Sequence, residues 1–204
     1  WAVDIDDRIR QLTPQDVIAN RTLFPDNFVR KGDGTMDYIR AGWINAAGSK
    51  DRGLDLGARL DGKLGGGRWT ASLDGTYLIT HKERALAVLP LQELVGEFGL
   101  RTLYLRWKHT AGLNYSSGAW STTFSQIYKS GYHDQDMSAK GTQPATANKD
   151  VSSYTLYNLY ATYSGYKNTS VTFGIQNLLN TNPPFTHHDV DDVAGAGWDP
   201  RVGD

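Results

Sequence analysis

Histidines and carboxylates gather in one stretch of the chain, residues 187–192, which reads His-His-Asp-Val-Asp-Asp. Imidazole nitrogens beside carboxylates are ligands for transition metals, so metal binding is one chemistry that this composition permits. Neighbouring histidines on a strand or turn point apart, however, and the stretch lacks the ligand spacing of a structural metal site. We therefore expect a solvated loop with no bound metal, and we interpret the group His133, Asp134 and Asp136 in the same way.

No catalytic constellation stands out elsewhere in the chain. Serine, histidine and aspartate all occur, but the sequence contains no G-x-S-x-G nucleophile motif. The glycines at 65–67 follow no phosphate-binding pattern and are typical of a tight hairpin. We predict no enzyme activity, no catalytic residues and no cofactor.

The composition bounds the class of protein. The chain has 204 residues, a net charge of −1 and no cysteine, together with 11 tyrosines, 6 tryptophans and 22 glycines. The near-neutral charge gives no reason to expect a nucleic-acid partner. Tyrosine and tryptophan favour strands and also suit a membrane–water interface. No run of 18 apolar residues is present, so no transmembrane helix is expected.

Alternation of apolar and polar residues predicts strands along most of the chain. It is clearest where Val171, Phe173 and Ile175 alternate with polar neighbours, and where leucines alternate with charged residues over 54–64. A short helix is expected near 14–20, after Thr13-Pro14, and residues 85–94 are either a short helix or a lid over the strands. The expected strands are 1–10, 36–64, 69–80, 102–114, 120–132, 151–164 and 168–176.

The connections between these strands alternate in length. Short turns are expected at 65–67, 116–118 and 165–167, and long loops at 11–35, 81–99, 133–150 and 181–204. Short turns at one end and long loops at the other are typical of an up-and-down transmembrane β-barrel, and strands of about ten residues suit a tilted crossing of a bilayer. The predicted fold class is all-β: about seven antiparallel strands of a transmembrane barrel.

A soluble β-sandwich or a soluble ligand-carrying barrel would show the same alternation, because either fold also has one apolar face. The sequence does not say which face points outward. Loop asymmetry, strand length and aromatic residues near strand ends favour the membrane. These aromatic residues are Trp1, Trp69, Tyr77, Tyr115, Trp120 and Tyr132.

Several motifs resemble one family. The segments Gly174–Asn180, Pro183–Phe185 and Gly197–Arg201 closely resemble the C-terminal region of TonB-dependent outer-membrane receptors. There a strand ends in an N-L-[FL]-[DN] motif and a [YW]-D-P-R segment precedes the final strand. Asn45, Gly48, Gly53 and Asp55 resemble the family's N-x-x-G…G-x-[DE] pattern, and residues 106–108 and 130–132 look like one subgroup.

The resemblance implies a barrel of 22 strands around an N-terminal plug. Such receptors lie in the outer membrane of Gram-negative bacteria and import siderophore-iron, haem, cobalamin or a carbohydrate with energy passed through TonB. Residues 1–204 show no plug, no TonB box and no final strand, and about seven strands would leave open edges. We therefore expect a fragment of the receptor barrel. The expected partners are outer-membrane lipid, the rest of the receptor, TonB through the plug, and the nutrient.

The same resemblance indicates where a ligand would bind. Its extracellular loops correspond here to the long loops, whose candidates are Tyr132, His133, Asp134, His187, His188 and Trp198. The alternative for Trp198 is that it packs the loop. Charged residues on the polar faces are expected to line the lumen and to pair across strands: Asp55, Arg59, Asp61, Asp74, Arg106 and Lys108. A soluble β-barrel that binds a small ligand and a porin-like passive channel remain as alternative functions.

Overall fold

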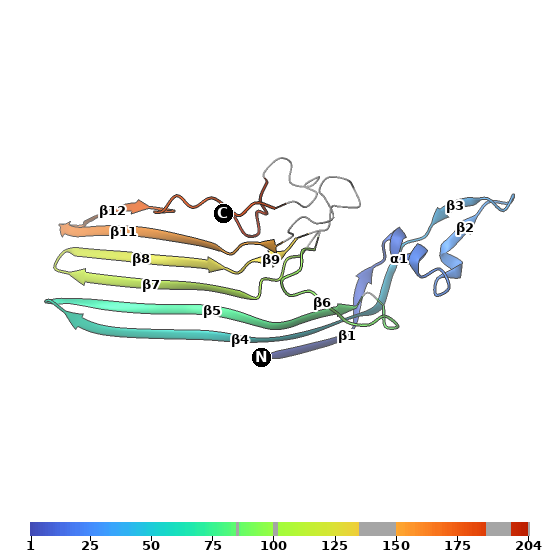
Figure 1. Ribbon diagram of the computed structural model, residues 1–204, viewed down its shortest axis with the longest axis horizontal. Coiled ribbons are helices and arrows are strands. Elements are labelled where there is room, and N and C mark those ends of the chain that lie inside the picture. The colour runs from blue at the N-terminus through green and yellow to red at the C-terminus, as the bar shows by residue number, and fades with distance from the viewer. Residues whose placement is uncertain (85, 100–101, 135–149, 187–196, 204) are drawn as a thin grey trace. The chain divides into compact units, whose positions relative to one another are not determined.

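The computed structural model describes residues 1–84, 86–99, 102–134, 150–186 and 197–203 (Figure 1). The chain forms two compact units. The larger unit contains Trp1 and residues 52–81 and 94–204, and the smaller unit contains residues 2–51 and 82–93. Neither helical segment of the described chain is long and apolar enough to cross a membrane.

The main sheet is an antiparallel meander, as predicted. Its strands follow the order β1-β4-β5-β7-β8-β11-β12, with the short β6 paired to β5, so seven strands form the main path within the described residues. The strands are β1 (Ala2–Gln11), β4 (Trp43–Leu64), β5 (Gly67–Arg84), β6 (Gln92–Glu93), β7 (Trp107–Ser117), β8 (Trp120–Lys129), β11 (Tyr154–Tyr166) and β12 (Thr169–Ile175).

The smaller unit has more structure than the sequence indicated. The predicted helix is present as α1 (Pro14–Ala19), where Thr13 and Asp16 form a reciprocal capping box. A 3₁₀ turn, η1 (Pro25–Asn27), leads into β2 (Phe28–Arg30), which pairs with β3 (Met36–Ile39) in a separate two-stranded sheet. The single extended region expected over 36–64 is therefore two strands.

A small apolar core holds this unit together. Leu12, Val17 and Leu86 are buried, and partly buried apolar side chains pack around them. Residues 86–94 form a turn and β6 rather than the helix considered from sequence. Lys82 lies opposite Glu93 across the β5–β6 pair. Leu86 lies in the turn between these two strands and is buried with Leu12 and Val17.

Glycines in β4 let large side chains approach the strand. In the smaller unit, a Cβ atom at Gly48 would lie 2.9 Å from Nε of Arg84, which forms an ion pair with Asp6 at 3.2 Å. In the larger unit, the Trp1 ring lies against Gly53, where a Cβ atom would overlap it. In this chain, steric contact with neighbouring side chains therefore explains why glycine occupies both glycine positions of the N-x-x-G…G pattern.

Three tight turns of the larger unit lie at the same end of its strands (Figure 1). Gly65 and Gly66 have φ angles of 53° and 81°, as a two-residue hairpin requires. Gly118 has a φ angle of 57° and Asn168 one of 59°. The third turn is Lys167-Asn168 rather than 165–167, because β11 continues through Tyr166 and asparagine tolerates the left-handed conformation.

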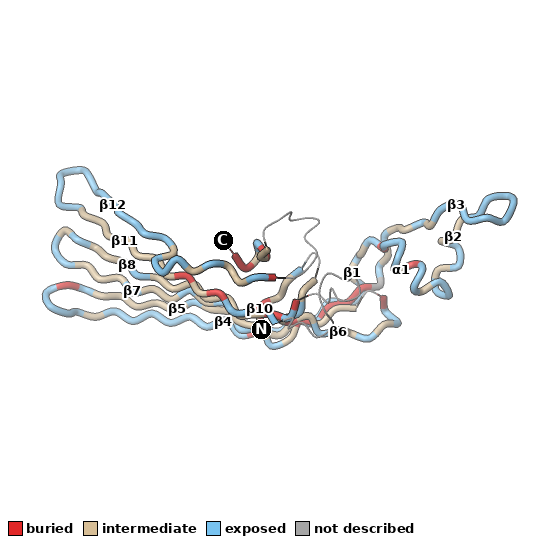
Figure 2. The backbone as a smooth tube through the Cα atoms, turned by 45° about the horizontal axis from the view of Figure 1, so that its top comes forward, coloured by how far each residue is buried: buried red, intermediate tan, exposed pale blue. Residues whose placement is uncertain are grey.

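Two short strands complete the larger unit. Strand β9 (Tyr132–His133) pairs with β10 (Asp150–Val151) in a sheet of their own. Tyr132 therefore leaves the apolar row of β8, which ends at Lys129. Figure 2 shows mainly exposed and half-buried residues along the long strands, and several buried ones where the long connections meet. The buried cluster there consists of Leu105, Tyr132, Val151, Tyr154, Leu156 and Val202.

One face of the main sheet is apolar and yet accessible. Leu60, Leu64 and Phe173 are 65–67% exposed, although a soluble sheet would cover such side chains with a second layer. Cross-strand pairs continue this face from strand to strand, with Leu113 opposite Phe124, and Leu159 opposite Ile175. A surface of this kind is typical of contact with lipid.

Aromatic side chains frame the apolar face at both ends. Near the short turns Trp69 lies opposite Tyr115, and near the long connections Tyr77 lies opposite Trp107. The positions of this face between them hold Ala71, Leu73 and Gly75 on β5, and His109, Ala111 and Leu113 on β7. Tyr77 lies eight positions after Trp69, which corresponds to about 26 Å along a strand. This length matches the apolar band of about 25 Å between the aromatic girdles of a membrane barrel.

Several girdle rings lie over glycines of the neighbouring strand. A Cβ atom at Gly62 would be 2.5 Å from Nε1 of Trp69, and one at Gly75 would be 2.5 Å from the Trp107 ring and 2.9 Å from Cβ of His109. The missing side chains leave room for the rings to lie flat on the sheet. The girdles thus depend on glycines that are far from any turn.

We predict that Gly75→Ala displaces the Trp107 ring and lowers the free energy of unfolding by about 1–3 kcal/mol, the usual cost of overpacking. Denaturant unfolding of the folded protein followed by tryptophan fluorescence measures both effects. Gly57→Ala is the matched control, because the nearest atom to its Cβ would be Oδ1 of Asp74 at 3.7 Å. Equal stability of the two variants would contradict the packing of Trp107 on Gly75.

Candidate functional site

The second face of the main sheet is polar and hydrogen-bonded across the strands. The Asn114 amide donates to the hydroxyls of Ser121 and Thr123 at 3.0 and 2.8 Å. The hydroxyls of Thr162 and Thr172 lie 2.9 Å apart on β11 and β12. This row of small polar side chains makes a wall suited to contact with water or with polar ligands.

Three of the charged residues predicted for the lumen lie on the polar side of β4. Asp55 accepts a hydrogen bond from the Thr76 hydroxyl at 2.8 Å. Asp61 accepts one from Thr70 at 3.2 Å and pairs with Arg59 on its own strand, also at 3.2 Å. The Arg59 and Asp61 side chains are 72% and 65% exposed, so this ion pair adds little stability.

Arg106 differs from the rest of that set. It precedes β7, in a bend rather than within a strand. Its guanidinium donates to the carbonyl oxygens of Ile79 and Leu78 at 3.1 and 3.4 Å. These bonds connect the chain entering β7 to β5, so Arg106 has a local structural partner.

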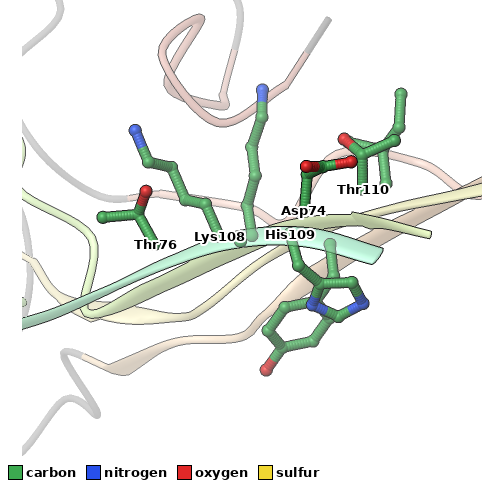
Figure 3. Close-up of a pocket in the computed structure, with 9 residues that line it drawn as sticks. Asp74, Thr76, Lys108, His109 and Thr110 are labelled. Carbon is green, nitrogen blue, oxygen red and sulfur yellow. The ribbon is translucent and has the colours of Figure 1, made fainter. Parts of the chain in front are cut away.

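Asp74 and Lys108 line one cavity of about 380 Å³ on the polar face. Figure 3 shows Asp74, Thr76, Lys108 and Thr110 extending from the same side of the strands, while His109 extends from the other side. Lys129 of β8 also lines the cavity and is the direct cross-strand neighbour of Lys108. Like charges placed opposite one another are unfavourable unless negative charge or solvent screens them.

A second cavity of about 250 Å³ adjoins the first. It is lined by amide side chains and apolar residues, and Ile127 lines both cavities. The amide side chains are those of Asn158, Gln176 and Asn177, and the apolar part of the lining includes Leu156. The two cavities together form a trough across β5, β7, β8, β11 and the end of β12.

Asn177 explains why the G-I-Q-N-L-L-N segment ends its strand abruptly. Its amide donates to the carbonyl oxygen of Thr181 at 3.0 Å, and its side-chain oxygen accepts from the Thr181 backbone N–H at 2.8 Å. The Asn177 backbone N–H donates to the side-chain oxygen of Asn158 at 2.9 Å. Asn177 and Asn180 have φ angles of 50° and 51°, which asparagine accepts more readily than most residues.

The loop candidates divide into a buried pair and an exposed residue. Tyr132 and Asp134 are 5% and 4% exposed, and Thr186 joins them. The Tyr132 hydroxyl donates to Thr186 at 3.2 Å, and the Thr186 hydroxyl donates to Asp134 at 2.7 Å. His133 is exposed, with Nδ1 3.0 Å from a carboxylate oxygen of Asp150. Tyr132 and Asp134 therefore stabilise the loops rather than face solvent.

The last described segment is anchored by Asp199 and Arg201. The Asp199 side chain is 1% exposed and forms an ion pair with Arg201 at 2.5 Å. The Arg201 guanidinium also donates to the carbonyl oxygen of Gly99 at 2.9 Å and lies 5.3 Å from the centroid of the Phe98 ring. The D-P-R segment thus binds the long connection between β5 and β7.

The remaining site predictions have different outcomes. Trp198 is half-buried, and a Cβ atom at Gly203 would lie 2.5 Å from its ring, which agrees with a packing role. His187, His188 and the rest of the 187–192 cluster lie outside the described residues. Among the residues that are described, no group of three or more histidine or acidic side chains is placed to hold a metal ion.

Sequence reasoning missed Lys129, Thr186 and Asp199 as parts of these arrangements. Lys129 lies opposite Lys108 because of the β7–β8 register, which no local pattern determines. Thr186 carries no motif, so no sequence signal could have identified it. Asp199 stands within the D-P-R segment, and that segment was the available signal.

Burial raises the pKa of Tyr132 to about 12, from 10.0 in the unfolded chain. The stability that this difference contributes is fully present below pH 10 and is lost as pH rises from 10 towards 12, by about 1.4 kcal/mol per pH unit. We expect tyrosinate absorbance of the folded protein to include a late-titrating step to which Tyr132 contributes. Tyr132→Phe should lower the amplitude of that step by one tyrosine, and an unchanged amplitude in this variant would contradict the assignment.

We expect Arg201→Ala to lower the free energy of unfolding by about 3 kcal/mol, because it leaves the Asp199 carboxylate buried without its cation. Denaturant unfolding measures the loss. Arg59→Ala removes the same charge from an exposed pair and should cost less than about 1 kcal/mol. Similar losses in the two variants would show that Asp199 is solvated.

The long antiparallel strands, the accessible apolar face between aromatic girdles and the polar opposite face define a section of a transmembrane β-barrel. The family model described as TonB dependent receptor-like, beta-barrel matches residues 2–178. The chain therefore belongs to the β-barrel family of TonB-dependent receptors, which are transporters of the Gram-negative outer membrane. Neither the comparison with curated proteins nor that with solved structures finds a match.

Proposed function

We propose that this chain is part of an outer-membrane receptor that imports a scarce nutrient with energy supplied through TonB. The observation that carries the proposal is the pairing of two unlike faces on one sheet of a receptor-family barrel. The apolar face, with Leu60 and Phe173 exposed, would contact lipid, while the polar face would enclose a wet lumen. A ligand-carrying soluble barrel has the opposite arrangement.

Residues 1–204 would form one part of the barrel domain, and the remaining strands and the plug would belong to the same receptor. The lumen residues Asp55, Arg59, Asp61, Asp74 and Lys108 would face water or the plug, and Arg106 would support the wall through the β5 carbonyls. Asp55 already has a cross-strand partner in Thr76. Asp74 and Lys108, for which the described residues offer no hydrogen bond or ion pair, are the members of this set that would be open to a partner from outside the segment.

The long connections would form the extracellular entrance. His133 is exposed and available to a ligand, whereas the buried Tyr132 and Asp134 would hold the loops in place. His187 and His188 remain ligand candidates on the same long connection, and Trp198 is a candidate for loop packing. The nutrient is siderophore-iron, haem, cobalamin or a carbohydrate, and the growth experiment below distinguishes these classes.

The proposal is tested in the source bacterium by deleting the gene that encodes this chain and, separately, the gene for TonB. We expect both strains to lose growth on the same limiting nutrient, and we expect the protein in the outer-membrane detergent extract. Growth that depends on the receptor but not on TonB would indicate passive diffusion. Recovery of the protein in the soluble fraction would contradict the proposal as a whole.

A further inference from the structure

The trough on the polar face combines two kinds of chemistry. The first cavity presents the amines of Lys108 and Lys129, the carboxylate of Asp74 and the hydroxyls of Thr76 and Thr110. Two amines and one carboxylate leave one net positive charge. Lys108 has no hydrogen bond or ion pair among the described residues, and the register keeps its Cα directly opposite that of Lys129. An anionic group seated there would relieve the repulsion between the amines.

Neighbouring groups of the chain limit what the first cavity accepts. The Lys129 amine already donates to the carbonyl oxygen of Val202 at 3.0 Å, which holds one of the two amines near the loops. The Asp74 carboxylate can accept hydrogen bonds from hydroxyl groups but repels a second anion. The cavity therefore favours a ligand with acidic groups and hydroxyl groups over a bare polyanion.

The second cavity suits the remainder of such a ligand. The Asn177 side chain is bonded to Thr181, and the Asn158 oxygen accepts from the Asn177 backbone N–H. The Gln176 amide nitrogen donates to the Tyr160 hydroxyl at 3.2 Å, and its side-chain oxygen can accept from a hydroxyl group of a ligand. Ile127 lies between the two cavities and provides an apolar surface between polar ends. From Lys108 on β7 to Gln176, which follows β12, there are three strand-to-strand steps, about 14 Å, and the registers add four residues along the strands, about 13 Å. This span fits an extended ligand of several linked units.

We propose that this trough binds an anionic, hydroxyl-rich ligand, with acidic groups at Lys108 and Lys129 and hydroxyl groups at the Gln176 amide of the second cavity. The inference rests on the proposed function, since it names the ligand class that the receptor recognises from its lumen. Two sources share this chemistry: an acidic oligosaccharide, and a metal complex of a hydroxycarboxylic acid. The trough stands at the end of the strands that carries the long connections, where an entering nutrient first meets the wall.

The test uses the intact receptor in detergent and measures binding of trigalacturonic acid, its neutral methyl ester and ferric citrate by calorimetry. We expect at least one acidic probe to bind, and the methyl ester to bind at least tenfold more weakly than trigalacturonic acid if the saccharide is the ligand. Lys108→Gln should weaken binding of the acidic probe at least tenfold. The probe that binds identifies the source.

Lys63→Gln is the matched control, because it removes the same charge from the polar side of β4, near the short turns. It should bind the acidic probe as the unmodified receptor does. Gln176→Ala should weaken binding several-fold by removing an amide from the second cavity. Circular dichroism and heat-dependent migration in gels establish that each variant is folded.

Two results would overturn the inference: no acidic probe binds the receptor, or Lys108→Gln binds as tightly as Lys63→Gln. If Lys108→Gln instead loosens the plug, measured by crosslinking, while probe binding is unchanged, the cavity seats a plug carboxylate and the inference also fails. Binding in detergent needs no TonB, so it is independent of the growth experiment. The proposed function can therefore fail while the ligand site stands, and the reverse is equally possible.

Discussion

The structure depends on one constraint: each strand must satisfy its backbone hydrogen bonds through its neighbours while its two faces meet different surroundings. In a bilayer no water is available to unpaired backbone groups, so only a continuous ladder is acceptable there. The uninterrupted registers of β5–β7, β7–β8 and β8–β11, ten paired positions each, meet this demand. The alternation of side chains then separates a lipid-compatible face from a polar one.

Local features serve this ladder rather than act independently. Glycines such as Gly62 and Gly75 leave room for girdle rings, and left-handed residues such as Gly66 and Asn168 close the turns without splaying the strands. At the other end, buried polar groups hold the long connections. Asp199 can be buried because Arg201 neutralises it, and Arg201 also bonds the last described segment to the connection between β5 and β7.

The proposed binding site is the part of the polar face whose charged side chains have no partner in the described chain. Most of its hydroxyls and amides bond one another, whereas Asp74 and Lys108 share a cavity without direct partners in the described chain. Both side chains are exposed, so water solvates their charges, and a partner supplied from outside this segment would bind in place of that water. Plug and ligand are the two sources that a receptor offers, and the trough's mixture of charge and amides favours the ligand.

Much of the architecture follows from the sequence alone. Seven strands of a receptor barrel were predicted from the period-two pattern, the unequal connections and the N-L-L-N and D-P-R segments. The pattern is visible in the sequence because a sheet with two unlike faces constrains every second residue. Helix α1 was also predicted from the sequence, because Thr13-Pro14 is typical of a helix N-terminus. Tertiary structure decided what depends on register and on distant contacts. It placed Lys129 opposite Lys108, joined Tyr132 to Asp134 through Thr186, and paired residues 92–93 with β5. No local pattern encodes such pairings, because each is created only when separate segments meet.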